Sequence, residues 1–339
     1  MENVKYPINM VGVNLTYKCN LKCYMCGQRN LDLGIQKQEV DYDTLCRFID
    51  ILKPYGLRFG VYLWGGEPFL YSKIFELVEF IHSKGLFVTV NTNGTMLEQY
   101  AEDIIKSRID RLIISIDGLE EVHDDIRGVK GTFKRVIDGI NKINSLKRFR
   151  PFLNSNTVIS SKNYHQLFEL IMYLKSLRLS SMELQLPMFF TEEMGNEYEL
   201  RMKTDFNVDA HSWKGFVGDY HEIDIPLLIS QLERIQEAIP RHLKLVPGLN
   251  KGQIAEYFTI PKAAFTNKMC NLPFSQIGVE PNGELVICPD FPDYVVGNIY
   301  NVEKVSDFWD SEKMRTFRNS LSEKGLLPIC SKCCQLYQF

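Results

Sequence analysis

Three cysteines lie close together in the segment VNLTYKCNLKCYMC near the start of the chain. Cys19, Cys23 and Cys26 have the spacing Cys-x3-Cys-x2-Cys and follow a β-branched apolar run that predicts a buried strand. Soft thiolates of this kind select iron–sulfur clusters, zinc or copper(I). A cubane cluster normally takes four cysteines, so three ligands would leave one iron open to a substrate or cofactor. Zinc with a distant fourth ligand, or three unpaired thiols, are the alternatives.

A second set of cysteines lies in the last quarter of the chain. Cys270 and Cys288 flank a predicted hairpin with its turn at residues 281–283, and the run Cys-Ser-Lys-Cys-Cys occupies residues 330–334. The hairpin is expected to place Cys270 and Cys288 at neighbouring ends, where two thiolates of the tail complete a closed site. Structural zinc or a fully ligated cluster fits four such ligands. Spacing alone favours zinc, because CxxC pairs are frequent zinc ligands.

Glycines and polar residues follow the later predicted strands, where the loops of an α/β barrel gather at one face. Gly65-Gly66-Glu67-Pro68 follows the second strand; its glycines admit a close backbone approach, and its carboxylate suits an amino group. Ser115 and Asp117 follow the fourth strand, and Arg127 is a planar, bidentate donor that suits a carboxylate. Each also has an ordinary interpretation as a turn residue or a surface arginine.

Short apolar strands alternate with amphipathic helices from residue 10 to about residue 190, which predicts an α/β fold with a parallel sheet. Six strands favour a partial, TIM-like (β/α)6 barrel. Thr95 and Glu98 predict a capping box, and Gly85 predicts a helix C-cap. The predicted strands are Val11–Tyr17, Phe59–Leu63, Leu86–Val90, Leu112–Ile116, Phe152–Ile159 and Met182–Leu186. The predicted helices are Thr44–Lys53, Ile74–Ser83, Met96–Ser107, Phe133–Asn144 and Tyr164–Leu177.

The pattern divides the chain into residues 1–190, a connector at 191–265 and a C-terminal domain at 266–339 with a β-hairpin. Residues 191–262 are polar and rich in turn residues, and one helix is predicted at Ile225–Ala238. A solvated connector with this single packed helix is favoured. A lid over the barrel is the alternative, because long loops in compact folds are often functional. Its substrate contacts would be Trp213, Tyr220 and His221.

Composition excludes several classes of protein. The 339 residues are 45% hydrophobic and 24% charged, with a net charge of 39 − 42 = −3, so no basic field indicates nucleic acid. No apolar run reaches the length of a membrane span, and no signal peptide is evident. Nine cysteines without an export signal indicate ligands or reduced thiols. A cytoplasmic location is therefore expected, with neither nucleic acid nor a membrane as partner.

The first cysteine loop resembles the signature of the radical S-adenosylmethionine (SAM) superfamily, Cys-x3-Cys-x-Φ-Cys after the first barrel strand. The Φ position is usually aromatic and touches the adenine; here it is Met25, whose polarizable thioether can lie against a ring. The resemblance extends over residues 10–190, because Gly65-Gly66-Glu67-Pro68 occupies the position of the family's methionine-amino-binding motif. It implies a 4Fe–4S cluster held by Cys19, Cys23 and Cys26.

The same resemblance implies which residues contact SAM. Ser115 and Asp117 suit the ribose hydroxyls or the methionine end, and the Ser-to-Arg arrangement is similar to that of the sulfatase-maturase branch. Leu186 would cover the adenine, although core packing explains it equally well, as a turn explains Asn93. The implied SAM contacts are Met25, Gly65, Gly66, Glu67, Asn93, Ser115, Asp117, Arg127 and Leu186.

The piece Cys-x12-Gly-x4-Cys from Cys270 to Cys288 resembles the opening of the SPASM domain, which carries auxiliary clusters in this superfamily. The later SPASM cysteine run is absent apart from its start, which suggests the shorter twitch variant with one auxiliary 4Fe–4S cluster. Its implied ligands are Cys270, Cys288, Cys330 and Cys333, with Cys334 as a possible substitute for Cys333. Asp290 lies one proline beyond the position of the maturase catalytic base, so it is a candidate base or an ordinary turn aspartate.

The resemblance implies an enzyme that reductively cleaves SAM and abstracts hydrogen from its substrate through a 5′-deoxyadenosyl radical. Family context leaves a residue of a peptide or a small polar metabolite, such as an amino sugar, as substrate. A flavodoxin or ferredoxin would supply electrons. The alternative from another class is a non-catalytic zinc- or iron–sulfur-binding scaffold or electron-transfer protein. Such a protein would need neither the Gly-Gly-Glu-Pro loop nor polar strand ends.

Overall fold

The computed structural model describes residues 4–30, 38–146, 151–218, 222–239, 241, 243–266 and 269–337. Within them, the strands form one ten-stranded sheet in the order β10-β9-β8-β1-β2-β3-β4-β5-β6-β7. All six strands predicted for the barrel are present, shifted by up to three residues. Strands β1–β6 are Ile8–Asn14, Gly56–Trp64, Val88–Thr92, Arg111–Ser115, Phe152–Val158 and Ser181–Gln185.

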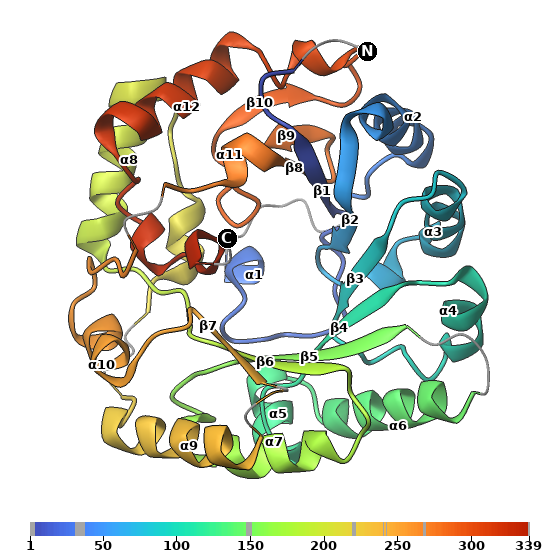
Figure 1. Cartoon of the computed structure of the whole chain (residues 1–339), viewed down its shortest axis with the longest axis vertical. Coiled ribbons are helices and arrows are strands. Elements are labelled where there is room, and N and C mark those ends of the chain that lie inside the picture. The colour runs from blue at the N-terminus through green and yellow to red at the C-terminus, as the bar shows by residue number, and fades with distance from the viewer. Residues whose placement is uncertain are drawn as a thin grey trace.

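Figure 1 shows these strands curved into an open ring with helices on its outside. Consecutive strands pair in parallel, as right-handed βαβ units require. The fold is therefore the predicted partial α/β barrel. The outer helices α2–α7 are Tyr42–Leu52, Ile74–Ser83, Ala101–Ser107, Glu120–Arg127, Thr132–Ser145 and Leu167–Lys175. Among the described residues, none of the helices combines the length and the apolarity that crossing a bilayer requires.

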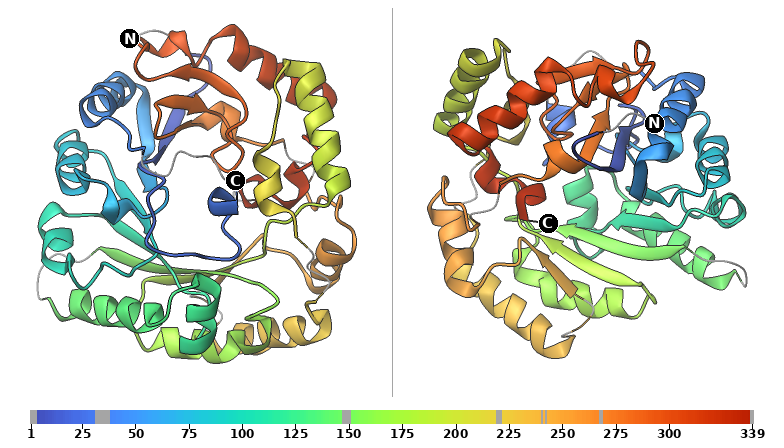
Figure 2. Two further views of the ribbon diagram at one scale, coloured as in Figure 1. Left: turned by 180° about the vertical axis from the view of Figure 1, so that it is seen from behind. Right: turned by 45° about the horizontal axis from the view of Figure 1, so that its top comes forward.

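Two strands from outside residues 1–190 extend this barrel. β7 (Leu243–Val246) pairs in parallel with β6, and β8 (Gln276–Val279) pairs in parallel with β1. β8 then forms the predicted hairpin with β9 (Glu284–Val286), and β10 (Val295–Asn298) continues it antiparallel. Figure 2 shows the C-terminal strands beside β1 from two further directions. The strand that leads into the first cysteine loop is consequently held on both of its edges.

Burial alternates along the strands and defines two different faces. Val13, Leu63 and Ile114 point toward the helices and are completely buried, which contributes about 1.5–3 kcal/mol for each side chain. The alternate positions, such as Asn91 and Asn156, are only half-buried. A complete TIM barrel fills its interior with layers of side chains. Here the interior is polar and partly open.

The predicted capping box is wrong, although Gly85 does follow the C-cap of α3 with a φ of +72°. Helix α4 begins only at Ala101 and has no side-chain cap. The Thr95 hydroxyl instead donates to Asn93 Oδ1 at 2.7 Å and accepts from Asn20 Nδ2 at 2.9 Å. These side-chain hydrogen bonds beside the cysteine loop compete with the backbone hydrogen bonds of a helix. The helix therefore begins later than predicted.

The connector is more structured than its composition predicts. Besides α9, which spans the predicted Ile225–Ala238, it contains α8 (Glu192–Phe206), α10 (Lys251–Thr259) and β7. Thr191 caps α8 by accepting from Met194 N, and this helix packs through buried side chains despite its weak amphipathic pattern. Trp213 is 1% exposed and belongs to the core, so it is not an exposed lid residue. Tyr220 and His221 lie outside the described residues.

Helix α12 (Glu312–Lys324) is anchored to the rest of the fold by a buried arginine. Arg318 is 5% exposed; its Nε donates to Pro273 O and its Nη1 to Trp309 O, both at 2.8 Å. Its guanidinium also lies 4.8 Å from the ring centroid of Tyr6, which precedes β1. Arg318 thus connects helix α12 to the segment before β8 and to the segment before β1.

We expect Arg318→Met to lower the unfolding free energy of the apoprotein by about 1.5–3 kcal/mol, because two buried carbonyls lose a charged donor. Guanidinium denaturation followed by circular dichroism measures this change. Arg315→Met on the same helix is the control, because Arg315 is exposed. Its effect should stay within about 0.5 kcal/mol. Equal losses for the two variants would contradict the anchoring role.

Candidate functional site

The first cysteine loop lies between the end of β1 and the short helix α1 (Gly27–Asn30). Two backbone hydrogen bonds join this loop to the end of α5: Lys22 N donates to Arg127 O at 3.0 Å, and Tyr24 N donates to Ile126 O at 3.2 Å. Cys19 is exposed, whereas Cys23 and Cys26 are half-buried. The three thiols are therefore presented by a loop that is fixed at its middle and accessible from the barrel mouth.

Two polar side chains from neighbouring loops contact the sulfurs. Asn93 Nδ2 lies 3.9 Å from Cys19 Sγ, and Arg127 Nη1 lies 3.7 Å from Cys23 Sγ. Although Cys19 is exposed as a residue, desolvation of its thiol by the surrounding protein raises its pKa to about 11. Burial also raises the pKa of Cys23, against the opposing effect of Arg127. Thiols in such surroundings keep their protons until a metal displaces them.

The Gly-Gly-Glu-Pro loop lies directly against the backbone that leads into Cys19. Gly66 N donates to Thr16 O at 2.7 Å, and Glu67 N donates to Lys18 O at 2.8 Å. A Cβ at Gly66 would lie 2.2 Å from Lys18 O, and Gly65 has a φ of +138°. Both glycines are required by this contact between the second strand and the cysteine loop.

The Glu67 carboxylate is completely buried and accepts from three protein donors. These are Phe69 N at 3.1 Å, Thr92 Oγ1 at 2.7 Å and Asn93 N at 2.8 Å. Burial raises the pKa of Glu67 to about 7, and these donors act in the opposite direction. In this structure the side chain joins the loops that follow β2 and β3, and it orients Asn93 toward Cys19.

Asp117 and Arg127 form a buried ion pair, with Asp117 Oδ2 at 2.5 Å from Arg127 Nη2. Asp117 Oδ1 also accepts from Val158 N at 3.0 Å. Because Arg127 contacts Cys23 as well, the pair links the ends of β4 and β5 to the cysteine loop. Ser115 is the last residue of β4 on the same side of the sheet, so the structure gathers these predicted residues at one edge.

Met25 and Leu186 lie in different surroundings. Met25 lies in the cysteine loop between two candidate ligands and is half-buried. Leu186 follows β6, is 1% exposed and is part of the hydrophobic core. Its backbone N–H donates to Val246 O on β7.

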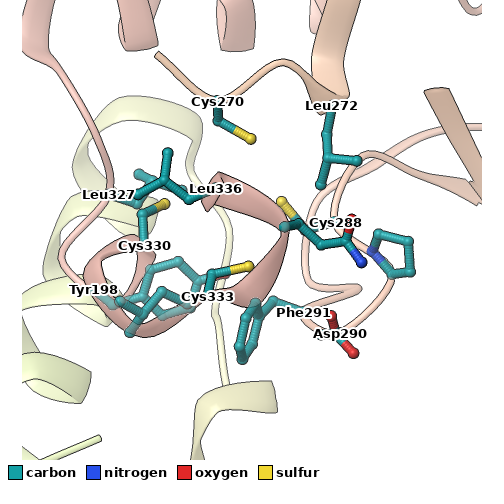
Figure 3. Close-up of a pocket in the computed structure, with 13 residues that line it drawn as sticks. Tyr198, Cys270, Leu272, Cys288, Asp290, Phe291, Leu327, Cys330, Cys333 and Leu336 are labelled. Carbon is teal, nitrogen blue, oxygen red and sulfur yellow. The ribbon is translucent and has the colours of Figure 1, made fainter. Parts of the chain in front are cut away.

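The second cysteine set lines one cavity, which we call the cysteine cavity. Figure 3 shows the side chains of Cys270, Cys288, Cys330 and Cys333 around this cavity. The structure therefore brings together four thiols that are up to 63 residues apart, from the approach to β8, the end of the hairpin and the tail. Cys334 is buried but does not line this cavity. Burial raises the pKa of Cys330 to about 12 and that of Cys333 well above its usual value.

The donor set fits a multi-atom cluster better than a single ion. In the part of the chain that the structure describes, no group of three or more His, Cys, Asp or Glu side chains is arranged to hold one metal ion. Tetrahedral zinc requires sulfurs that converge to about 2.3 Å from one point. Four thiols spread around a cavity instead suit a cubane, whose irons bring the metal to each sulfur.

A second pocket, which we call the mouth pocket, is lined by residues next to the first cysteine loop and by Pro289 and Asp290 next to the cysteine cavity. Asp290 and its neighbour Pro289 line both this pocket and the cysteine cavity. Burial raises the pKa of Asp290 to about 6. The other side chains of interest in its wall are Tyr17, Gln28, Trp64, Phe216 and Glu280. The wall thus comes from both sides of the first cysteine loop, from β2, from the connector and from the hairpin.

Glu280 was not predicted from the sequence. It is 3% exposed, and its Oε2 accepts from Tyr17 Oη at 2.6 Å and from Asn14 Nδ2 at 2.9 Å. The signal available in the sequence is a carboxylate directly before the Pro-Asn-Gly turn of the hairpin. That signal does not reveal that the hairpin pairs with β1.

The sequence comparisons agree with this geometry. Residues 13–174 match the radical SAM superfamily, and residues 270–334 match the SPASM iron–sulfur cluster-binding domain. The chain is 23% identical over 347 residues to the tungsten-containing aldehyde ferredoxin oxidoreductase cofactor-modifying protein of Pyrococcus furiosus, covering 95% of this chain and 86% of the relative. It is 24% identical over 308 residues to the GTP 3′,8-cyclase of Marinobacter nauticus, covering 87% and 81%.

Solved structures share the fold at lower identity. Streptococcus suis SuiB bound to its precursor peptide SuiA has a TM-score of 0.68 and 17% identity, covering 96% of this chain and 71% of SuiB. The enzyme anSMEcpe with bound AdoMet and the Cp18Cys peptide has a TM-score of 0.64 and 17% identity, covering 98% and 88%.

The fold and the two cysteine sites define a cluster-dependent enzyme with a barrel and a C-terminal auxiliary domain. The chain carries a radical SAM domain at residues 13–174 and a SPASM-type domain at residues 270–334. Its cofactors are SAM, a 4Fe–4S cluster at the SAM site and an auxiliary 4Fe–4S cluster.

We expect Gly66→Ala to remove the cluster at the first cysteine loop, because the new Cβ would collide with Lys18 O. After anaerobic reconstitution, iron should fall from about eight to about four per chain, since each cubane holds four irons. Iron and sulfide analysis measures this loss.

Gly252→Ala is the matched control, because a Cβ there would meet its nearest atom at an ordinary 3.5 Å. The control should retain about eight irons. Full iron loading of Gly66→Ala would show that the loop tolerates the displacement.

Proposed function

We propose that this enzyme reductively cleaves SAM at the first cysteine loop and modifies a substrate bound in the mouth pocket. The observation that carries the proposal is the place of that pocket. Gln28, two residues beyond Cys26, lines one side of it, and Asp290, on the wall of the cysteine cavity, lines the other. A substrate held there would be adjacent to both cluster sites.

Cys19, Cys23 and Cys26 would hold the cluster and leave one iron for the amino and carboxylate groups of SAM. When bound there and reduced, SAM supplies a 5′-deoxyadenosyl radical that abstracts a hydrogen atom from the substrate. The proposed SAM contacts are Met25, Gly65, Gly66, Glu67, Asn93, Ser115, Asp117, Arg127 and Leu186.

These side chains would act in different ways. The Arg127–Asp117 pair and Asn93 orient polar hydrogens toward the cluster sulfurs, as their contacts to Cys23 and Cys19 support. Glu67 accepts from three protein donors and joins two loops, so any contact with SAM would use the acceptor position that these donors leave. The backbone of Gly65 and Gly66 then presents the rest of the SAM site. Leu186 contributes a buried apolar surface at the end of β6.

The auxiliary ligands in this proposal are Cys270, Cys288, Cys330 and Cys333, which line the cysteine cavity. Asp290 would accept a proton from the substrate, since its carboxylate lines the mouth pocket beside this cavity. An electron donor such as a flavodoxin or a ferredoxin would supply reducing equivalents. The substrate would be a peptide residue or a small polar metabolite. One relative is named as a cofactor-modifying protein, and the structural neighbour SuiB is bound to a precursor peptide.

The test is anaerobic reconstitution followed by incubation with SAM and a reductant. We expect about eight irons per chain and formation of 5′-deoxyadenosine, which liquid chromatography with mass spectrometry detects. Cys19→Ala should abolish 5′-deoxyadenosine formation. Cys46→Ala is the control, because Cys46 lies in α2, packs in the hydrophobic core and does not line the cysteine cavity. Nucleotide cleavage by Cys19→Ala would refute the assignment of the first loop.

A separate comparison distinguishes the two adjacent cysteines of the tail. We expect Cys333→Ala to lose the auxiliary cluster, because Cys333 lines the cysteine cavity, and Cys334→Ala to keep it. Electron paramagnetic resonance of the reduced proteins, together with iron content, reports each cluster. The opposite result would identify Cys334 as the ligand.

A further inference from the structure

The mouth pocket is lined by two acidic side chains, Glu280 and Asp290. Among the lining residues that the structure describes, none is a lysine, an arginine or a histidine. Both hydrogen bonds to the Glu280 side chain go to Oε2, so Oε1 accepts none from the described residues. No described residue donates to the carboxylate of Asp290. A side chain as buried as Glu280 normally has its charge balanced.

The neighbours of Glu280 do not supply that balance. Burial raises its pKa to about 7; Tyr17 and Asn14 lower this value by donating, whereas Glu284 and Asp290 raise it further. The fold therefore holds two carboxyl groups at the wall of a cavity, and the described part of that wall contains no basic side chain. Keeping them there has a cost that a cationic ligand would remove.

The remaining wall of the pocket suits the same kind of ligand. Tyr17, Trp64 and Phe216 contribute aromatic rings to it. Aromatic faces attract ammonium groups, and most strongly where water is excluded. Carboxyl groups and aromatic rings together favour a cation, whereas a phosphate or carboxylate group would find no positive partner among the described lining residues.

We propose that the mouth pocket binds a primary ammonium group of the substrate between Glu280 and Asp290. The inference rests on the proposed function, because it assigns the substrate class of the same site. Either a lysine side chain of a peptide or an amino sugar would supply this group. Glu280 is then a substrate-binding residue held in place by Tyr17 and Asn14.

The experiment measures binding of four probes to the anaerobically reconstituted holoenzyme with SAM, by isothermal titration calorimetry. The probes are the peptide acetyl-Gly-Lys-Gly-amide and its norleucine counterpart, and glucosamine and glucose. In at least one of these two pairs, the ammonium-bearing member should bind at least about tenfold more tightly, as a charge-assisted hydrogen bond predicts. The pair that shows the preference identifies the source of the ammonium group.

Glu280→Gln and Asp290→Asn should each remove most of this preference, since they keep the shape of the pocket but not its charge. Glu284→Gln is the matched control from the same hairpin, because Glu284 does not line the pocket, and it should keep the preference. Equal affinity for charged and neutral probes in the unmodified enzyme would overturn the proposal without any variant. An unchanged preference in both pocket variants would also overturn the proposal. The same holds for binding of Mg²⁺ or Mn²⁺ alone that depends on Glu280.

Formation of 5′-deoxyadenosine without substrate separates this inference from the proposed function. If the enzyme cleaves SAM but shows no charge preference, the ammonium site alone is refuted. If it does not cleave SAM, the proposed function fails regardless of the binding result.

Discussion

The buried pair of Arg127 and Asp117 is the interaction on which the geometry of the first cysteine loop depends. Taking two charges out of water is costly, and the cost is recovered only when both remain paired and hydrogen-bonded. Here Asp117 also accepts from Val158 N, and Arg127 also contacts Cys23. Removing either partner would leave an uncompensated charge beside a cluster ligand. The pair therefore sets the position of the loop relative to β4 and β5 rather than contributing much net stability.

Contacts between neighbouring loops also organise the rest of the site. Glu67 joins two strand loops, and the glycines before it let the loop lie against Thr16 and Lys18. The hairpin of β8 and β9 brings Glu280 to the mouth pocket, and Asp290, just beyond it, to the boundary between the two cavities. Glu67, Asp117 and Glu280 converge because each follows the carboxyl end of a parallel strand in one continuous sheet.

Much of the fold could be predicted from the sequence, because periodicity and thiol spacing are local signals. The six barrel strands, the helix at Ile225–Ala238 and the hairpin follow from such patterns. Helix α8 could not be predicted, because its stability comes from Met194, Tyr198 and Met202 packing against the core rather than from its own amphipathicity.

The site was predictable to a different extent. The cysteines and the polar strand ends were found because each lies beside a turn or a strand end in the sequence. Glu280 was not, since its partner Asn14 is 266 residues away along the chain. The role of Glu67 in joining two loops was hidden for the same reason. Thr95 was assigned to a helix cap because local rules do not include Asn20, which occupies its hydroxyl.

The double pairing of β1 has a consequence for biosynthesis. One of its neighbours, β2, leaves the ribosome about 50 residues later, but the other, β8, is made more than 260 residues later. At typical elongation rates of about 5–20 residues per second, one edge of β1 stays unpaired for roughly 15–50 s. An open strand edge is a template for wrong pairing. The nascent chain therefore needs protection over this interval, and the metal centre beside β1 is best loaded after translation has finished.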